Sequence, residues 1–439
     1  MALTYLLIIL FAFMLLGVPI GFAIGGATMA AIFLFTNLNP IIIGQFCFSG
    51  INSFTIMAIP FFMLAGVIMS KGGIARRIVN FAGALIDFVT GAVGCVAALA
   101  SMFFGTVSGS GMATASAIGA MMIPEMKRAG YNPAYAATLV CFGGLVGPVL
   151  PPSLAYVLYG SVTNVSIAKV FLAGILPGIL LGSIVLCVNI FMCSRMQVDL
   201  KKSEPTEVKI EYVPMSAALK NRAKRIAVAF KDGVFALITP FIILGGIYSG
   251  VFTPTEAACV SVIYAIIVSM FIYKEMDFKD LRETLLDAAV LNGITSFLLA
   301  YSVVFSTFMT FERVPQRLSM FLSGVSENPF VALLLINLML LLIGLLLDTV
   351  PAIIIMAPLL LPTIVGIGVD PIHFGVIMAS NLAIGLCTPP YGCNLFVGAA
   401  VAKIRMETML PFTVPFLIAS LAGLLIITFV PWLSMVFVN

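Results

Sequence analysis

Small polar residues gather at two points of an otherwise apolar chain. The first is the Ser-Gly-Ser-Gly run at 108–111, and the second is the pair Asp348 and Thr349 within the apolar stretch 330–362. A carboxylate inside such a stretch is costly and usually functional, and hydroxyl oxygens can ligate a small cation. Asp348 has the alternative role of capping a helix at the end of a hairpin. The sequence leaves both roles open.

Two double prolines interrupt the long apolar segments 133–160 and 371–400, within the runs 147–153 and 385–391. Each proline lacks an N–H and clashes with the preceding turn, which costs about 3 kcal/mol in a helix interior. We therefore expect unwound backbone at both runs, where freed carbonyl oxygens need a partner in the protein, in water or in an ion. A pair of passive kinks is the alternative.

The elements that position these residues are membrane helices. The chain has 439 residues, is 62% hydrophobic and 9% charged, and has its first charged residue at Lys71. These values exclude an ordinary soluble globule and a disordered chain. The leading 70 residues are too long for a signal peptide and have no basic start, so we interpret them as retained helices.

The basic residues predict how the chain crosses the membrane. Nine of the 22 lie between Arg195 and Lys231, and this basic segment predicts a cytoplasmic linker. A span needs about 20 apolar residues. The resulting segments are spans at 4–17, 19–36, 52–70, 133–160 and 170–194, and at 233–250, 252–273, 288–311, 371–400 and 411–437, with hairpins at 90–126 and 328–363. This topology puts 19 of the 22 basic residues inside. The net charge of +4 therefore gives no reason to expect a nucleic-acid partner.

The two halves align at a constant offset of 238 residues. Prolines or glycines match at 124 and 362, 133 and 371, 147 and 385, 151–152 and 389–390, 160 and 398, and 177 and 415. Each half crosses the membrane an odd number of times, so the halves have opposite orientations. We therefore predict an all-α polytopic membrane protein with inverted-topology repeats at 1–194 and 232–439, joined by the cytoplasmic linker 195–231. Each repeat contains a re-entrant helical hairpin and a broken transmembrane helix.

Each hairpin tip is expected to face one unwound segment, which predicts two sodium sites. The first site would use Ser108, Ser110, Gly147 and Pro151, and the second Gly344, Thr349, Gly385 and Thr388. Helix N-termini at the tips carry partial positive charge suited to an anion. The substrate is expected between the tips, near Ser153, Tyr391 and Asn394, with Asp348 as a further candidate.

At these residues the chain resembles the large membrane subunit of TRAP transporters, the tripartite ATP-independent periplasmic family. The resemblance covers essentially the whole chain and includes the run Gly-Val-Phe-Thr-Pro-Thr-Glu-Ala-Ala at 250–258, the Ser-Gly-Ser-Gly tip, Leu-Pro-Pro-Ser at 150–153 and Thr-Pro-Pro at 388–390. Glu256 belongs to the distinctive first run, and we assign it a packing or capping role.

This resemblance implies sodium-driven uptake of an organic acid, commonly a C4-dicarboxylate or a sialic acid, across the bacterial inner membrane. It also implies a periplasmic substrate-binding protein, a small four-helix membrane subunit as partner, and an elevator motion. In that motion the hairpins and broken helices move against a fixed scaffold.

Three other classes of protein are alternatives to this interpretation. A standalone sodium/carboxylate symporter of the same fold fits the residues equally well, and only the family motifs favour the tripartite system. An intramembrane enzyme has little support, because His373 is the only histidine and Asp348 and Asp370 are far apart in the expected topology. A passive channel is disfavoured because no ring of charged residues lines a path. The eight cysteines have no metal-site or redox spacing.

Overall fold

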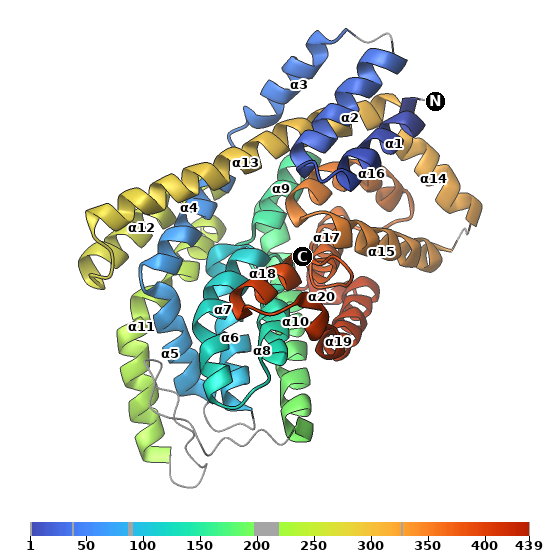
Figure 1. Ribbon diagram of the computed structural model, residues 1–439. Coiled ribbons are helices and arrows are strands. Elements are labelled where there is room, and N and C mark those ends of the chain that lie inside the picture. Colours follow the sequence, from blue (N-terminus) through green and yellow to red (C-terminus); the bar gives the residue numbers. More distant parts are fainter. Residues whose placement is uncertain (1, 37–38, 87–90, 197–218, 326–327, 439) are drawn as a thin grey trace.

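The computed structural model describes residues 2–36, 39–86, 91–196, 219–325 and 328–438, and every regular element in these ranges is helical (Figure 1). In the first half the helices are α1 (Ala2–Leu15), α2 (Ile20–Phe35), α3 (Ile41–Ile51), α4 (Ala58–Lys71), α5 (Ile74–Ile86), α6 (Ala92–Ser108), α7 (Gly111–Arg128), α8 (Pro133–Gly144), α9 (Leu154–Thr163) and α10 (Ile167–Met196).

The second half continues from α11 (Leu219–Tyr248) through α12 (Pro254–Ile267), a π-helical turn (Val268–Ile272), α13 (Phe278–Phe311), α14 (Val314–Val325), α15 (Pro329–Leu346), α16 (Thr349–Gly366), α17 (Pro371–Gly385), α18 (Cys393–Ala402), a 3-10 turn (Met406–Met409), α19 (Leu410–Phe429) and α20 (Trp432–Met435). Of the predicted linker 195–231, residues 197–218 lie outside the described residues.

Seven helices in the described ranges are long and apolar enough to cross a membrane. They lie at Ile167–Arg195, Lys224–Tyr248, Pro254–Ile272, Phe278–Phe311, Pro329–Leu346, Thr349–Gly366 and Met406–Phe429. This result confirms the prediction of an all-α polytopic membrane protein. The shorter apolar helices include α1, α2 and α3.

The predicted span 52–70 is more complex than a single straight helix. Residues 54–57 form turns before α4, and α4 meets α5 at a bend of 67°. Gly73 lies at this bend with a φ of +79°, a conformation that residues with side chains rarely adopt. The bend therefore ends α4 at Lys71, within the chain's first charged segment.

The helix pattern recurs at the offset found in the sequence. Adding 238 to the bounds of α7 gives 349–366, which are the bounds of α16, and adding it to the start of α8 gives the start of α17. Both Pro151–Pro152 and Pro389–Pro390 are cis peptide bonds. The same helical unit thus occurs twice, while the opposite orientation of the two copies in a membrane stays a prediction.

The broken helices and the first hairpin form the interior of the molecule. In α8 every residue after Pro133 is buried, and in α17 the residues from His373 to Gly385 are buried. In Figure 1 the hairpin α6–α7 and helix α18 lie at the centre, with α4, α5 and α11 on one side and α10 and α19 on the other. The outer helices expose large apolar side chains, such as Phe241 at 75% and Phe278 at 78%.

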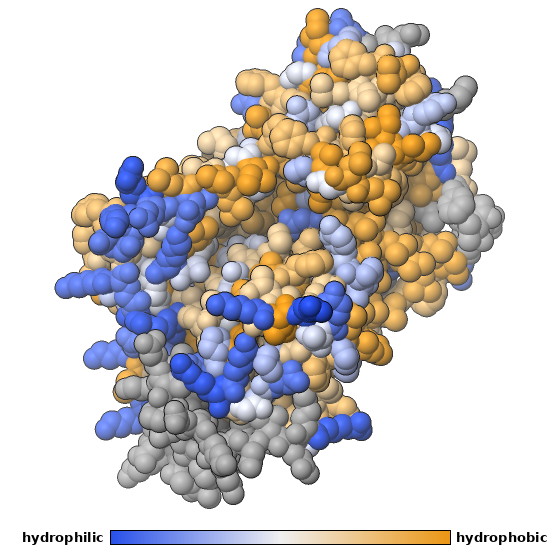
Figure 2. Space-filling model, viewed as in Figure 1, coloured by the Kyte–Doolittle hydropathy of each residue, from blue (hydrophilic) through white to orange (hydrophobic). Residues whose placement is uncertain are grey.

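The surface has two zones in the view of Figure 2. Apolar residues cover the upper part, over α1 to α3 and α13 to α16, while hydrophilic residues gather toward the lower part and the corner between α12 and α13. A large exposed apolar surface is unfavourable in water and suits contact with lipid or with other membrane helices.

The distinctive run at 250–258 forms the start of α12. The Glu256 carboxylate accepts hydrogen bonds from the Thr253 backbone N–H at 2.7 Å and from its hydroxyl at 2.8 Å, and the Thr253 hydroxyl oxygen accepts one from the Glu256 N–H at 3.3 Å. This reciprocal arrangement is a capping box, with Pro254 at the first helical position. The capping role assigned to Glu256 is confirmed.

Candidate functional site

The first hairpin turns at Gly109 and Ser110. Gly109 ends α6 with a φ of +61°, and Ser110 is extended and caps α7 by accepting a hydrogen bond from the Ala113 N–H at 3.4 Å. A residue with a side chain at 109 would be strained by this φ and would also lie 3.0 Å from the Leu154 nitrogen. The Ser-Gly-Ser-Gly sequence therefore fits the tight tip that we expected.

Three oxygen atoms meet at this tip. The Thr114 hydroxyl donates to the Ser110 carbonyl oxygen at 2.8 Å, and the Ser108 hydroxyl oxygen lies 2.8 Å from the Thr114 hydroxyl oxygen and 3.3 Å from the Ser110 carbonyl oxygen. Sequence reasoning missed Thr114. Its spacing of four residues from Ser110 is the available signal, because residues i and i+4 share one face of a helix.

The first tip packs directly against the first unwound segment. A Cβ atom at Gly105 would lie 3.0 Å from the Gly147 Cα, and one at Gly147 would lie 2.9 Å from the Ser110 carbonyl oxygen. Ser108, Ser110 and Gly147 are thus brought together as predicted. Pro151 is buried beside Pro152, whose carbonyl oxygen lies 3.2 Å from a Cβ built at Gly109.

The second tip has the same construction with different side chains. Asp348 caps α16 by accepting a hydrogen bond from the Thr349 N–H at 2.7 Å. The Thr349 hydroxyl is buried and has no hydrogen-bond partner among the described residues. A Cβ at Gly385 would lie 2.7 Å from the Gly344 Cα, so the hairpin and the second unwound segment touch through their backbones. Thr388 follows in that segment, and its hydroxyl donates to the Ile384 carbonyl oxygen at 2.8 Å.

The predicted substrate residues are dispersed around these tips. Ser153 is buried and caps α9, because its hydroxyl oxygen accepts from the Ala155 N–H at 3.2 Å while its hydroxyl donates to the Pro148 carbonyl oxygen at 2.5 Å. Tyr391 is 54% exposed and packs edge-on against the Phe396 ring.

Asn394 comes from the second half but lies at the tip of the first. A Cβ atom built at Gly111, the first residue of α7, would lie 3.1 Å from the Asn394 amide nitrogen and 3.4 Å from its amide oxygen. The side chain is fully buried, the amide nitrogen donates to the Cys141 carbonyl oxygen at 3.4 Å, and the amide oxygen lacks a partner among the described residues. A buried acceptor without a donor is unfavourable unless a ligand or water completes it.

The two halves interlock around the tips. Helix α9 of the first half packs against α16 and α17 of the second, and α18 of the second half packs against α7 and α8 of the first. The N-termini of α7, α9, α16 and α18 follow the two tips and the two unwound segments. Such N-termini provide partial positive charge for an anion.

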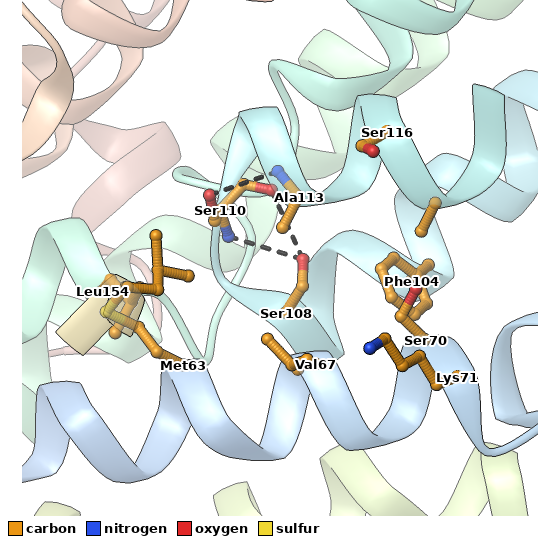
Figure 3. A pocket seen from close by; sticks show the side chains of 13 residues that line it. Met63, Val67, Ser70, Lys71, Phe104, Ser108, Ser110, Ala113, Ser116 and Leu154 are labelled. Atoms are coloured by element: carbon orange, nitrogen blue, oxygen red, sulfur yellow. Dashed lines mark hydrogen bonds between the residues drawn. The ribbon is translucent and has the colours of Figure 1, made fainter. Parts of the chain in front are cut away.

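A cavity of about 220 Å³ lies between α4 and the first tip (Figure 3). Its lining includes Ser108, Ser110 and Leu154 from the tip region and Ser70 and Lys71 from the end of α4. The Lys71 ammonium pairs with an Asp287 carboxylate oxygen on α13 at 2.5 Å. Sequence reasoning assigned Lys71 to the inner surface only. Its proximity to the tip depends on how α4 crosses the hairpin, which no local pattern encodes.

Paired hairpins and broken helices, enclosed by apolar helices of membrane length, define a polytopic membrane transporter. A solved structure with this fold is the YdaH transporter of Alcanivorax borkumensis. It has a TM-score of 0.53 and 12% identity, and the match covers 83% of this chain and 84% of that one. At this identity the likeness shows the fold alone.

Residues 7–433 match the family described as "Tripartite ATP-independent periplasmic transporter, DctM component", and the chain belongs to this family. It is 34% identical to the "C4-dicarboxylate TRAP transporter large permease protein DctM" of Vibrio cholerae, covering 99% of this chain and 97% of the relative. It is also 34% identical to the "Sialic acid TRAP transporter large permease protein SiaM" of the same species, with coverages of 92% and 91%.

A third relative is the "Isethionate TRAP transporter permease protein DctMQ" of Oleidesulfovibrio alaskensis, which is 37% identical over 97% of this chain. The chain spans 64% of that relative's length. All three relatives are named as transporter permeases, and this chain is a multi-pass transporter subunit rather than an enzyme.

Proposed function

We propose that this chain drives the sodium-gradient-dependent uptake of a small organic acid of the C4-dicarboxylate or sialic acid type. Two relatives carry names of those substrate classes. The observation that carries the proposal is the pairing of each hairpin tip with an unwound segment, at Gly105 and Gly147 and at Gly344 and Gly385. Backbone contact at both places brings carbonyl and hydroxyl oxygens together, and such oxygens suit sodium.

The residues at both tips fit a sodium ion. At the first tip Ser108, Ser110, Gly147 and Pro151 would supply oxygens, with Thr114 added by the structure. At the second tip Gly344, Gly385 and Thr388 would contribute, together with the unpartnered Thr349 hydroxyl. Bound sodium supplies positive charge close to the helix N-termini, which favours an anion beside it.

The organic acid would then lie between the tips, near Asn394, Ser153, Tyr391 and Asp348. Asn394 has the strongest support, because its buried amide oxygen has no partner among the described residues and can accept a hydrogen bond from a substrate hydroxyl. Ser153 already satisfies a helix N-terminus, so its contribution is to fix the start of α9.

The hairpins and broken helices would move as one elevator unit against the outer helices. The buried, interlocked packing of α7 to α9 with α16 to α18 supports a single moving body. The basic linker 195–231 would lie in the cytoplasm of a bacterial cell and the protein in its inner membrane. A periplasmic substrate-binding protein would deliver the acid, and a small four-helix subunit would cover part of the exposed apolar surface.

The test is uptake into liposomes that contain this chain and its small subunit. Labelled succinate and labelled N-acetylneuraminic acid are supplied with and without a sodium gradient and the substrate-binding protein. Accumulation that needs both the gradient and the binding protein is the expected result. Sodium-driven accumulation without the binding protein would instead favour the standalone symporter of the same fold. Uptake that does not depend on sodium would contradict both the proposed function and the symporter alternative.

A further inference from the structure

The cavity between α4 and the first tip contains one positive charge. Lys71 is the charged residue among the described side chains that line it, and the others are apolar or carry hydroxyl groups. A Cβ atom built at Gly66 would lie 3.4 Å from the Ser108 Cα. Helix α4 therefore runs directly beside the tip. Lys71 lies five residues further along α4, about 7.5 Å at the helical rise.

The opposite wall supplies groups that favour an anion. Ser110 and Ala113 belong to the first turn of α7, where N–H groups and the helix dipole favour negative charge. Ser70 and Ser116 add two hydroxyl groups to the lining. Figure 3 shows Lys71 and Ser70 on α4 facing the hairpin that carries Ser108, Ser110 and Ser116.

The present partner of Lys71 is easily exchanged. The ion pair with Asp287 is exposed, with side-chain exposures of 47% for Lys71 and 64% for Asp287. Exposed ion pairs contribute little to stability, because water competes for both charges. A carboxylate that enters the cavity gains the same ammonium together with the hydroxyl groups of the lining.

We propose that this cavity binds a carboxylate of the transported acid. On binding, the Lys71 ammonium leaves Asp287 and pairs with the substrate carboxylate instead. Asp287 holds the lysine while the cavity is empty and competes with the substrate for it. At about 220 Å³ the cavity is smaller than the 300–1,000 Å³ typical of drug-sized ligands, which suits a small acid or the carboxylate end of a larger one. The inference rests on the proposed uptake of an organic acid.

Two substitutions separate this role from a purely structural ion pair. Lys71→Gln removes the cation and is expected to raise the KM for the acid about tenfold or more, since a charged hydrogen bond is lost. Asp287→Asn removes the competitor and is expected to lower KM or leave it unchanged. A structural ion pair would be broken equally by both, so both variants would then behave alike.

The experiment measures uptake of labelled succinate and N-acetylneuraminic acid into liposomes at saturating sodium, with the small subunit and the substrate-binding protein present and with Lys71→Arg as partial rescue. Lys279→Gln, a lysine at the start of α13 outside the cavity lining, is the matched control with unchanged KM. The inference is overturned if Lys71→Gln has the same KM as wild type, or if Asp287→Asn raises KM as much as Lys71→Gln does. In either case, uptake by the wild-type protein would still support the proposed function. A wild-type protein that accumulates neither acid under any gradient overturns both.

Discussion

At the residue scale, the two hairpin tips cap the helices that follow them with different side chains. Ser110 and Asp348 are related by the offset of 238 residues, and each caps the second arm of its hairpin. The capping role left open for Asp348 is therefore observed. Its carboxyl group has two oxygens, so one can cap the helix while the other is available to the proposed sodium site.

Thr349 offers a clean test of the proposed second sodium site. Its hydroxyl is buried without a partner among the described residues, so Thr349→Val removes no hydrogen bond within the protein. If this oxygen ligates sodium, the variant raises the sodium concentration for half-maximal uptake about tenfold, equal to roughly 1.4 kcal/mol. Its thermal stability in detergent without sodium is expected to stay within about 0.5 kcal/mol of wild type.

The same helix contains the control for this substitution. Thr363 also lies on α16 with a buried hydroxyl that has no partner among the described residues, but it is far from the tip. Thr363→Val is expected to leave the sodium dependence unchanged. Equal shifts in both variants would show that the effect comes from α16 packing and would remove Thr349 from the ligand set.

At the element scale, close backbone contact between hairpin and unwound segment is the feature that builds the site. At Gly385 a methyl group would lie 2.6 Å from the Gly344 carbonyl carbon, and backbone cannot swing aside as a long side chain can. Gly385→Ala is therefore expected to destabilise the protein by about 1–3 kcal/mol and to reduce sodium-driven uptake. Thermal unfolding in detergent and liposome uptake measure the two effects.

Gly293 in the middle of α13 provides the comparison. A Cβ there would meet nothing within 4 Å, so Gly293→Ala is expected to stabilise the helix by about 0.5–1 kcal/mol. Matching losses at both positions would mean that helix mobility, rather than the contact of Gly344 with Gly385, governs the outcome.

Sequence alone could predict these elements where the cause is local. Proline removes an N–H wherever it stands, so the breaks at 147–153 and 385–391 and the two hairpins could be located. Thr114 and Lys71 could not be placed, because their roles depend on which face of α7 turns inward and on how α4 crosses the hairpin. Crossing geometry arises from packing between distant segments, which local patterns do not encode.

At the scale of the whole molecule, the duplicated helical unit and the distribution of charge lead to one topology. The 19 basic residues assigned to the inside include those of the linker, and the remaining three are Lys169, Arg313 and Arg317. The predicted inversion of the second half would explain why equivalent loops differ in charge. The loop after α9 leads to Lys169, while the equivalent loop after α18 contains Lys403 and Arg405.

Those two loops provide a decisive test of inversion. Lys169 and Lys403 are both exposed. Lys169 lies in the first turn of α10, directly after the loop that follows α9, and Lys403 lies in the loop that follows α18. In a background whose eight cysteines are replaced, Lys169→Cys is expected to react with a membrane-impermeant maleimide added to spheroplasts, because the start of α10 is predicted to face the periplasm. Lys403→Cys is expected to react only after the membrane is disrupted, because its loop is predicted to face the cytoplasm. Labelling of both cysteines from the same side would mean that the two units are parallel, and this result would contradict the proposal of two inverted units with one sodium site each.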